Sequence, residues 1–67
     1  MQETELELAE RHVREGAAHV ARQKEMVEQL HRDGHPAAEA EDLLRVLETT
    51  LAQYRTGLEH IRQLTKQ

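Results

Sequence analysis

Histidines are the side chains of this 67-residue sequence whose type could most readily do chemistry, and there are five of them. His12 and His19 are seven residues apart, so in a helix they share a face but are separated by about 10.5 Å along the axis. One metal ion, with ligand bonds of about 2 Å, cannot bind both. A chain that folds back on itself would bring His60 toward His12. These three histidines are the weak candidates for a metal site.

The histidines have two other interpretations. In the first they flank a helix seam, with the apolar part of the ring on the seam and the polar edge in water. We favour this interpretation over a metal site. In the second they sense pH, because an imidazole becomes charged below about pH 6.5. If His12 or His19 lies in a subunit interface, the assembly is expected to weaken between neutral pH and about pH 5.

The other familiar catalytic arrangements are missing from the sequence. It contains no Cys and no Ser, which leaves the Thr hydroxyls and Tyr54 as the only alcohols. Without Cys there is no disulfide and no thiolate metal site, and no glycine-rich loop could cradle a phosphate. The Glu41-Asp42 pair fits the solvated first turn of a helix. The sequence therefore predicts neither an enzyme nor a bound cofactor.

The charge pattern argues against several other classes of protein. The net charge is −4, and a chain without a basic stripe lacks what supplies most of the affinity for nucleic acid. Trp and Phe are absent, unlike in helices that lie on membranes, and no apolar run approaches the roughly 18 residues that cross a bilayer. The acidic N-terminus does not look like a signal peptide. We expect a cytoplasmic protein with no nucleic-acid or membrane partner.

The elements that position these residues meet at Asp33-Gly34-His35-Pro36, where the helix-breaking residues cluster. Gly34 suits the left-handed position after a helix, and Pro36 suits the first turn of the next one. Thr4 and Glu7 have the spacing of a capping box at the start of the first helix. The sequence predicts one all-α domain, residues 1–67, with a helix over about 4–33, a turn at 33–36 and a helix over about 36–65.

Charged residues support both predicted helices. Acidic residues lie near each helix N-terminus and basic residues toward the second C-terminus, which matches the helix dipoles. Glu–Arg pairs spaced i,i+4 with the acid first are expected to stabilise the first helix. They are Glu7–Arg11, Glu10–Arg14 and Glu28–Arg32.

Apolar residues recur in steps of three and four along both halves, which is the pattern of a heptad seam. The residues that we expect to bury are Leu6, Val13, Val20, Val27, Leu30, Leu44, Leu47, Leu51, Tyr54, Leu58 and Ile61. The first half of this seam is thin, since Ala9 and Gly16 are small and Gln23 is polar. Folding about Gly34 pairs residues whose numbers sum to roughly 67–70, which would let Gly16 make room for Tyr54.

A third row of residues widens the stripe on both halves. It consists of His12, His19 and Met26 in the first half, and of Leu43 and Leu64, with Thr50 and Gly57 between them, in the second. A stripe of this width is typical of a bundle and not of a single pair of helices. We therefore predict an antiparallel, coiled-coil-like two-helix hairpin that dimerises into a four-helix bundle.

A set of residues from the middle of the chain resembles a known group of proteins. These residues are His12-Val13, Glu15-Gly16, His19, Ala21-Arg22-Gln23, Leu30, Asp33-Gly34-His35, Ala40, Leu43-Leu44 and Leu47-Glu48. The group comprises small uncharacterised helical-hairpin proteins of alphaproteobacterial genomes, and the resemblance covers roughly residues 6–60. It implies the hairpin fold and no activity. Members often carry a polar residue where this sequence has Pro36.

The size of the chain points to association. A chain of 67 residues rarely buries enough surface alone, and oligomerisation is the usual remedy when disulfides are missing. We predict a small non-enzymatic protein–protein interaction or scaffold module that acts through its helix faces. Its expected partner is a second copy, with another helical protein as a further candidate. The alternative is a metal- or pH-responsive regulator that uses His12, His19 and His60.

Overall fold

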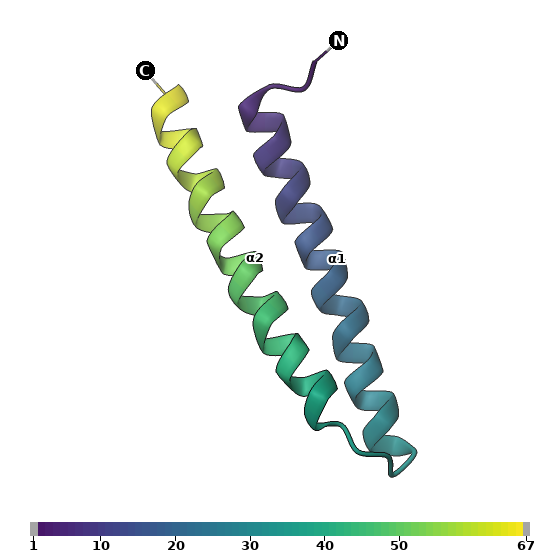
Figure 1. Ribbon diagram of the computed structural model, residues 1–67. Helices are drawn as coiled ribbons and strands as arrows, with labels where there is room; N and C mark the ends of the chain where they lie inside the picture. Colours follow the sequence, from purple (N-terminus) through teal and green to yellow (C-terminus); the bar gives the residue numbers. More distant parts are fainter. Residues whose placement is uncertain (1, 67) are drawn as a thin grey trace.

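The computed structural model describes residues 2–66 and consists of two helices, α1 (Glu5–Arg32) and α2 (Ala38–Thr65). The helices run antiparallel and side by side, with the turn at one end of the molecule and both termini at the other (Figure 1). The molecule measures 53 × 23 × 13 Å, which is a single layer of two helices. The predicted all-α antiparallel hairpin is confirmed. Neither α1 nor α2 has a stretch long and apolar enough to cross a membrane.

The start of α1 is fixed by the capping box that the sequence predicted. The Glu7 amide donates to Thr4 Oγ1 at 3.1 Å, and the Thr4 amide donates to Glu7 Oε1 at 3.0 Å. Because the Glu7 carboxylate is turned back toward the cap, Arg11 pairs with Glu3 at 2.9 Å and with Glu15 at 3.0 Å. The expected Glu7–Arg11 pair is therefore replaced by two other pairs.

The end of α1 is a Schellman motif centred on Gly34, which has φ 70°. Glycine adopts this left-handed conformation without steric cost. The His35 amide donates to the Leu30 carbonyl at 2.9 Å, and the Gly34 amide donates to the His31 carbonyl at 3.2 Å. These bonds satisfy carbonyls that the last turn of a helix leaves free. The role predicted for Gly34 is confirmed.

The start of α2 lies two residues later than the sequence predicted. Ala37 is the N-cap, with φ −119° and ψ 2°, and it makes no side-chain capping bond. Pro36 therefore precedes the helix and does not form its first turn. A proline disfavours helical geometry at the residue before it, and residues 35–37 lie outside both helices. The Glu41 amide then donates to the Ala37 carbonyl at 2.9 Å.

The core is a narrow strip between the two helices. Its buried residues are Val20, Ala37, Leu51 and Leu58, together with Gln23. No side chain within residues 2–66 is fully buried, because a single layer of helices leaves solvent on both faces. Gln23 is only 7% exposed, and its Nε2 donates to the Ala40 carbonyl at 2.9 Å. This bond satisfies the buried amide and ties the two helices together.

Candidate interaction surface

The exposed large hydrophobic side chains gather on one side of the hairpin. This surface, called the apolar face below, comprises Met26 of α1 and Leu43, Val46, Tyr54 and Leu64 of α2. Tyr54 is 38% exposed, Val46 59% and Leu64 62%. Exposed apolar residues scattered singly need no explanation, whereas a contiguous patch indicates a binding surface.

Two grooves show that these residues share a face. One is lined by His12, Tyr54 and Gly57, and the other by His12, Tyr54 and Thr50. Leu43 is seven residues before Thr50 and Leu64 is seven after Gly57, so both continue the same side of α2. Met26 follows the third row of α1 in the same way, seven residues after His19, which also lines the second groove. Both third rows therefore contribute to the apolar face. Val46 borders the same face, because it lines a further groove together with Thr50.

The opposite surface is charged. This charged face carries Lys24 of α1 with Glu48 and Arg55 of α2, which line one shallow groove above Val20 and Leu51. Arg62 of α2 and Glu10 of α1 approach each other across the hairpin at 3.9 Å. The pair that we expected between Glu10 and Arg14 is thus replaced by this cross-helix contact, whereas Glu28 and Arg32 approach at 3.9 Å as expected. The large exposed hydrophobic side chains therefore lie on one side of the hairpin, whereas Lys24, Glu48 and Arg55 line the other side.

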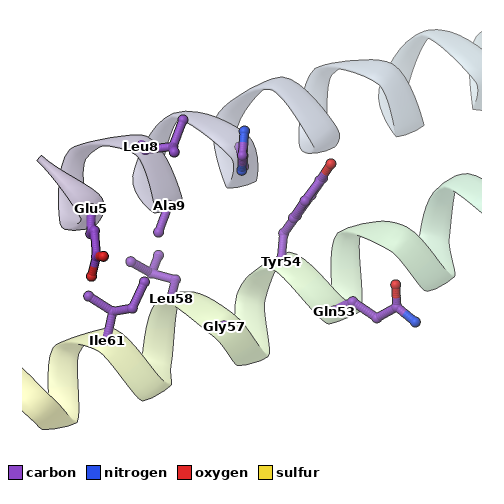
Figure 2. A pocket seen from close by; sticks show the side chains of 9 residues that line it. Glu5, Leu8, Ala9, Gln53, Tyr54, Gly57, Leu58 and Ile61 are labelled. Atoms are coloured by element: carbon purple, nitrogen blue, oxygen red, sulfur yellow. The ribbon is translucent and has the colours of Figure 1, made fainter. Parts of the chain in front are cut away.

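Tyr54 is the centre of the apolar face. Its ring lies against the ring of His12, with the centroids 4.9 Å apart and the planes inclined by 32°. The groove beside it has a volume of about 380 Å³. Figure 2 shows Tyr54 rising from α2 next to Gly57, while Leu8 and Ala9 of α1 lie across from Leu58 and Ile61. The seam residues Leu58 and Ile61 thus form the bottom of the groove, and the groove is open to solvent above Gly57.

The two helical glycines have different surroundings. A Cβ atom on Gly16 would lie 3.2 Å from Leu51 Cδ1 and 3.5 Å from Tyr54 Cδ2. The missing side chain of Gly16 therefore leaves space for Tyr54, as expected. It also leaves space for Leu51, which approaches Gly16 more closely than Tyr54 does. A Cβ atom on Gly57 would meet nothing within 4 Å. Gly57 leaves empty space on the apolar face that no part of residues 2–66 fills.

The predicted seam residues differ in burial. Val20, Leu51 and Leu58 are buried and Tyr54 is exposed. The others are half-buried: Leu6, Val13, Val27, Leu30, Leu44, Leu47 and Ile61. Sequence reasoning did not include Gln23 or Ala37 among the residues to bury. The heptad position of Gln23 was a usable signal, but nothing in the local sequence marked Ala37.

The three candidate metal-binding histidines have separate surroundings. His12 lies against Tyr54, His19 Nδ1 is 3.0 Å from an Arg22 guanidinium nitrogen, and His60 is exposed. Across residues 2–66, no three His, Asp or Glu side chains come together as a metal site would require. Near the turn, His31 Nε2 lies 3.7 Å from Glu41 Oε1.

One ion pair perturbs the titration of its members. The Arg11 guanidinium hydrogen-bonds the Glu3 carboxylate, from Nη2 to Oε1 at 2.9 Å and from Nε to Oε2 at 3.0 Å, with a longer bond from Nε to Oε1 at 3.3 Å. This hydrogen bonding lowers the pKa of Glu3 and raises the pKa of Arg11. The pair lies at the exposed N-terminal end, where it holds the segment before the helix against α1.

Comparisons with protein-family models, with curated proteins and with solved structures find no match to this chain. The resemblance to alphaproteobacterial hairpin proteins is confirmed only in the two-helix fold that it implied. No family is identified, and function must be argued from the surface itself.

Proposed function

We propose that the chain is a small non-enzymatic protein–protein interaction or scaffold module that acts by association of its helix faces, first of all with a second copy of itself. The observation that carries the proposal is the separation of the hairpin into an apolar and a charged face. The exposed Met26, Leu43, Val46, Tyr54 and Leu64 lie on one side, which is where a partner would gain most from excluding water.

The thinness of the core supports the same proposal. A hairpin whose most buried apolar residue, Leu51, still keeps 5% of its surface exposed has little hydrophobic stabilisation of its own. Covering the apolar face with a second hairpin would turn one layer of helices into two, which is the architecture that small helical domains use. The result would be a four-helix bundle.

The test is the molar mass in solution by light scattering, at two chain concentrations and with a chelator present. The proposal expects twice the chain mass of 7.8 kDa at the higher concentration. A monomer at both concentrations would refute self-association. A pull-down with the intact chain would then show whether the same face binds another helical protein.

The alternative function, a regulator that responds to metal or pH through His12, His19 and His60, has its own test. A ligand that binds only the folded state raises the melting temperature. Zinc should therefore raise it if these histidines bind the metal, and His12→Gln should abolish the increase. An unchanged melting temperature would leave only pH as the signal, which the dissociation constant of the dimer at pH 7 and at about pH 5 would report.

A further inference from the structure

We infer that two hairpins pair through their apolar faces about a twofold axis that lies in the interface and runs perpendicular to the helices. In this arrangement α1 packs on α1, α2 packs on α2, both pairs are antiparallel, and the two turns lie at opposite ends. The inference rests on the proposed self-association and adds to it the identity of the contacts.

The pattern of α2 is symmetric about its own centre. Its outward row, called the α2 row below, alternates steps of four and three, as heptad contacts require. The row is Leu43, Leu47, Thr50, Tyr54, Gly57, Ile61 and Leu64. Read from either end, the α2 row consists of two large aliphatic residues, then one small residue, and then Tyr54 at its centre. A twofold interface places the same patch on both subunits, so the patch must complement itself.

An antiparallel pairing about the midpoint of this row matches its two large end residues with each other and its two small residues with each other. The midpoint falls between Gln53 and Tyr54, which pairs Leu43 with Leu64 of the second copy and Thr50 with Gly57. Leu43 is 48% exposed and Leu64 is 62% exposed. Both therefore have apolar surface that such a contact would cover.

Tyr54 fits the hole that this pairing offers. In helix pairs of this kind a side chain inserts among four residues of the facing helix, at positions i, i+3, i+4 and i+7. Tyr54 of the second copy would enter the hole formed by Thr50, Gln53, Tyr54 and Gly57. The hole is open because a Cβ on Gly57 would meet nothing within 4 Å.

The outward row of α1 has its midpoint at the same height. Read in steps of four and three, this row is Leu8, His12, Glu15, His19, Arg22 and Met26, which extends the third row of α1. Only its two ends are large and apolar, and its centre falls at Ala17. The structure places the neighbouring Gly16 beside Tyr54, since a Cβ on Gly16 would lie 3.5 Å from Tyr54 Cδ2. One twofold axis can therefore relate both helices at once, with Leu8 packing against Met26 of the second copy.

On α1 the same axis sets Glu15 opposite His19 of the second copy. Both residues line the groove beside Tyr54, so both lie at the edge of the proposed contact.

The whole side of the hairpin that carries the apolar face is large enough for this contact. A face of 53 by 23 Å projects on the order of 1,200 Å², whereas a stable dimer needs about 800 Å² from each partner. A second geometry, with the axis parallel to the helices, would instead pack α2 on α1 of the second copy and set Leu43 against Met26. In that geometry neither the α2 row nor the outward row of α1 would pack against the same row of the second copy.

Disulfide cross-linking distinguishes the two geometries, and the absence of Cys from the chain makes single substitutions clean. Leu43→Cys chains mixed with Leu64→Cys chains should form a disulfide-linked pair under mild oxidation. Neither variant should link to itself, since residue 43 would lie about 31 Å along the axis from its own copy, far beyond the roughly 7 Å that a disulfide spans between Cα atoms.

The matched control is a mixture of Met26→Cys and Leu43→Cys chains, which should not link. Linking of this mixture in preference to the 43–64 mixture would overturn the inference in favour of the second geometry. A dimeric mass by light scattering without any 43–64 link would refute the inferred arrangement alone. A monomeric mass would refute the proposed function with it.

A substitution at Gly57 provides a second test that does not depend on oxidation. Gly57→Gln fills the hole expected to receive Tyr54 while meeting free space within the hairpin, so the helix should form normally by circular dichroism. The dissociation constant of the dimer should rise more than about tenfold, because overpacking a closed contact is costly. Ala52→Gln, an exposed position outside the α2 row, should leave it unchanged. An equal effect of both substitutions would overturn the inference.

Discussion

Gly16→Ala tests how closely the two helices approach. Alanine in place of a mid-helix glycine ordinarily gains about 1 kcal/mol of helix propensity. Here the new methyl group would lie 3.2 Å from Leu51 Cδ1 and 3.5 Å from Tyr54 Cδ2. Leu51 would have to shift by a few tenths of an ångström in the best-packed part of the core, and overpacking of this kind typically costs about 1–3 kcal/mol.

The shift is small, so we expect the overpacking cost to be about 1–2 kcal/mol. The two effects then leave Gly16→Ala between neutral and about 1 kcal/mol less stable. Ala18→Gly is the matched control, because Ala18 is exposed two residues further along α1 and reports propensity alone. It should lower the free energy of unfolding by about 1 kcal/mol.

The assay is thermal and urea unfolding of all three chains, followed by circular dichroism at one fixed chain concentration. In a domain of this size 1 kcal/mol moves the melting temperature by about 4–8 °C, so the difference between the two behaviours is measurable. The reasoning is refuted if Gly16→Ala raises stability by as much as Ala18→Gly lowers it, because the close approach to Leu51 would then have no energetic effect.

Further predictions concern the core and the exposed ion pair. Leu51→Ala should lower the free energy of unfolding by about 2–3 kcal/mol, the lower part of the usual range because this thin core can relax around the cavity. Thr56→Ala, at an exposed position outside the α2 row, should change it by less than about 0.5 kcal/mol, and equal losses would mean that the seam is misplaced. Gln23→Leu should change unfolding in urea by less than about 1 kcal/mol, because an apolar side chain of similar size replaces one hydrogen bond; a loss above about 3 kcal/mol would show that the bond to the second helix is essential. Arg11 hydrogen-bonds the Glu3 carboxylate and lowers its pKa, so this pair stabilises the fold above the unfolded-state pKa of Glu3 and the stabilisation is lost as pH falls through the lower folded-state value. Arg11→Gln should raise the pKa of Glu3 in an NMR titration, and an unchanged pKa would show that the pair does not persist in solution.

Local signals in the sequence predicted the ends of α1 well. The capping box of Thr4 and Glu7 and the left-handed Gly34 involve groups within one turn of each other, so their geometry depends on few neighbours. The start of α2 was placed two residues early, because a proline at the first helical turn and a proline just before the helix satisfy the same local rules. Only the path of the turn distinguishes the two positions.

The charge partners show the same limit. Arg11 has acidic residues within reach on both sides, and i,i+4 spacing favoured Glu7. In the structure the Glu7 carboxylate accepts a hydrogen bond from the Thr4 amide in the N-cap, and Arg11 forms ion pairs with Glu3 and Glu15. Similarly, Glu10 reaches Arg62 on the other helix. The spacing of charged residues along a helix indicates which ion pairs are possible. Which of these pairs forms depends on the positions of all the neighbouring side chains, including those of the other helix.

Periodicity in the sequence was enough to determine that two helices form, that they fold back at Gly34, and which stripe of each turns inward, because all three follow from residues related by one or two helical turns. The tertiary structure decided how the helices are rotated and shifted against each other. That rotation buries Gln23 against the Ala40 carbonyl, places Leu51 over Gly16, and brings the two third rows to one side of the hairpin. The physical reason is that a single helix specifies the residues on its own face, whereas a surface shared by two helices exists only once their relative orientation is fixed by packing.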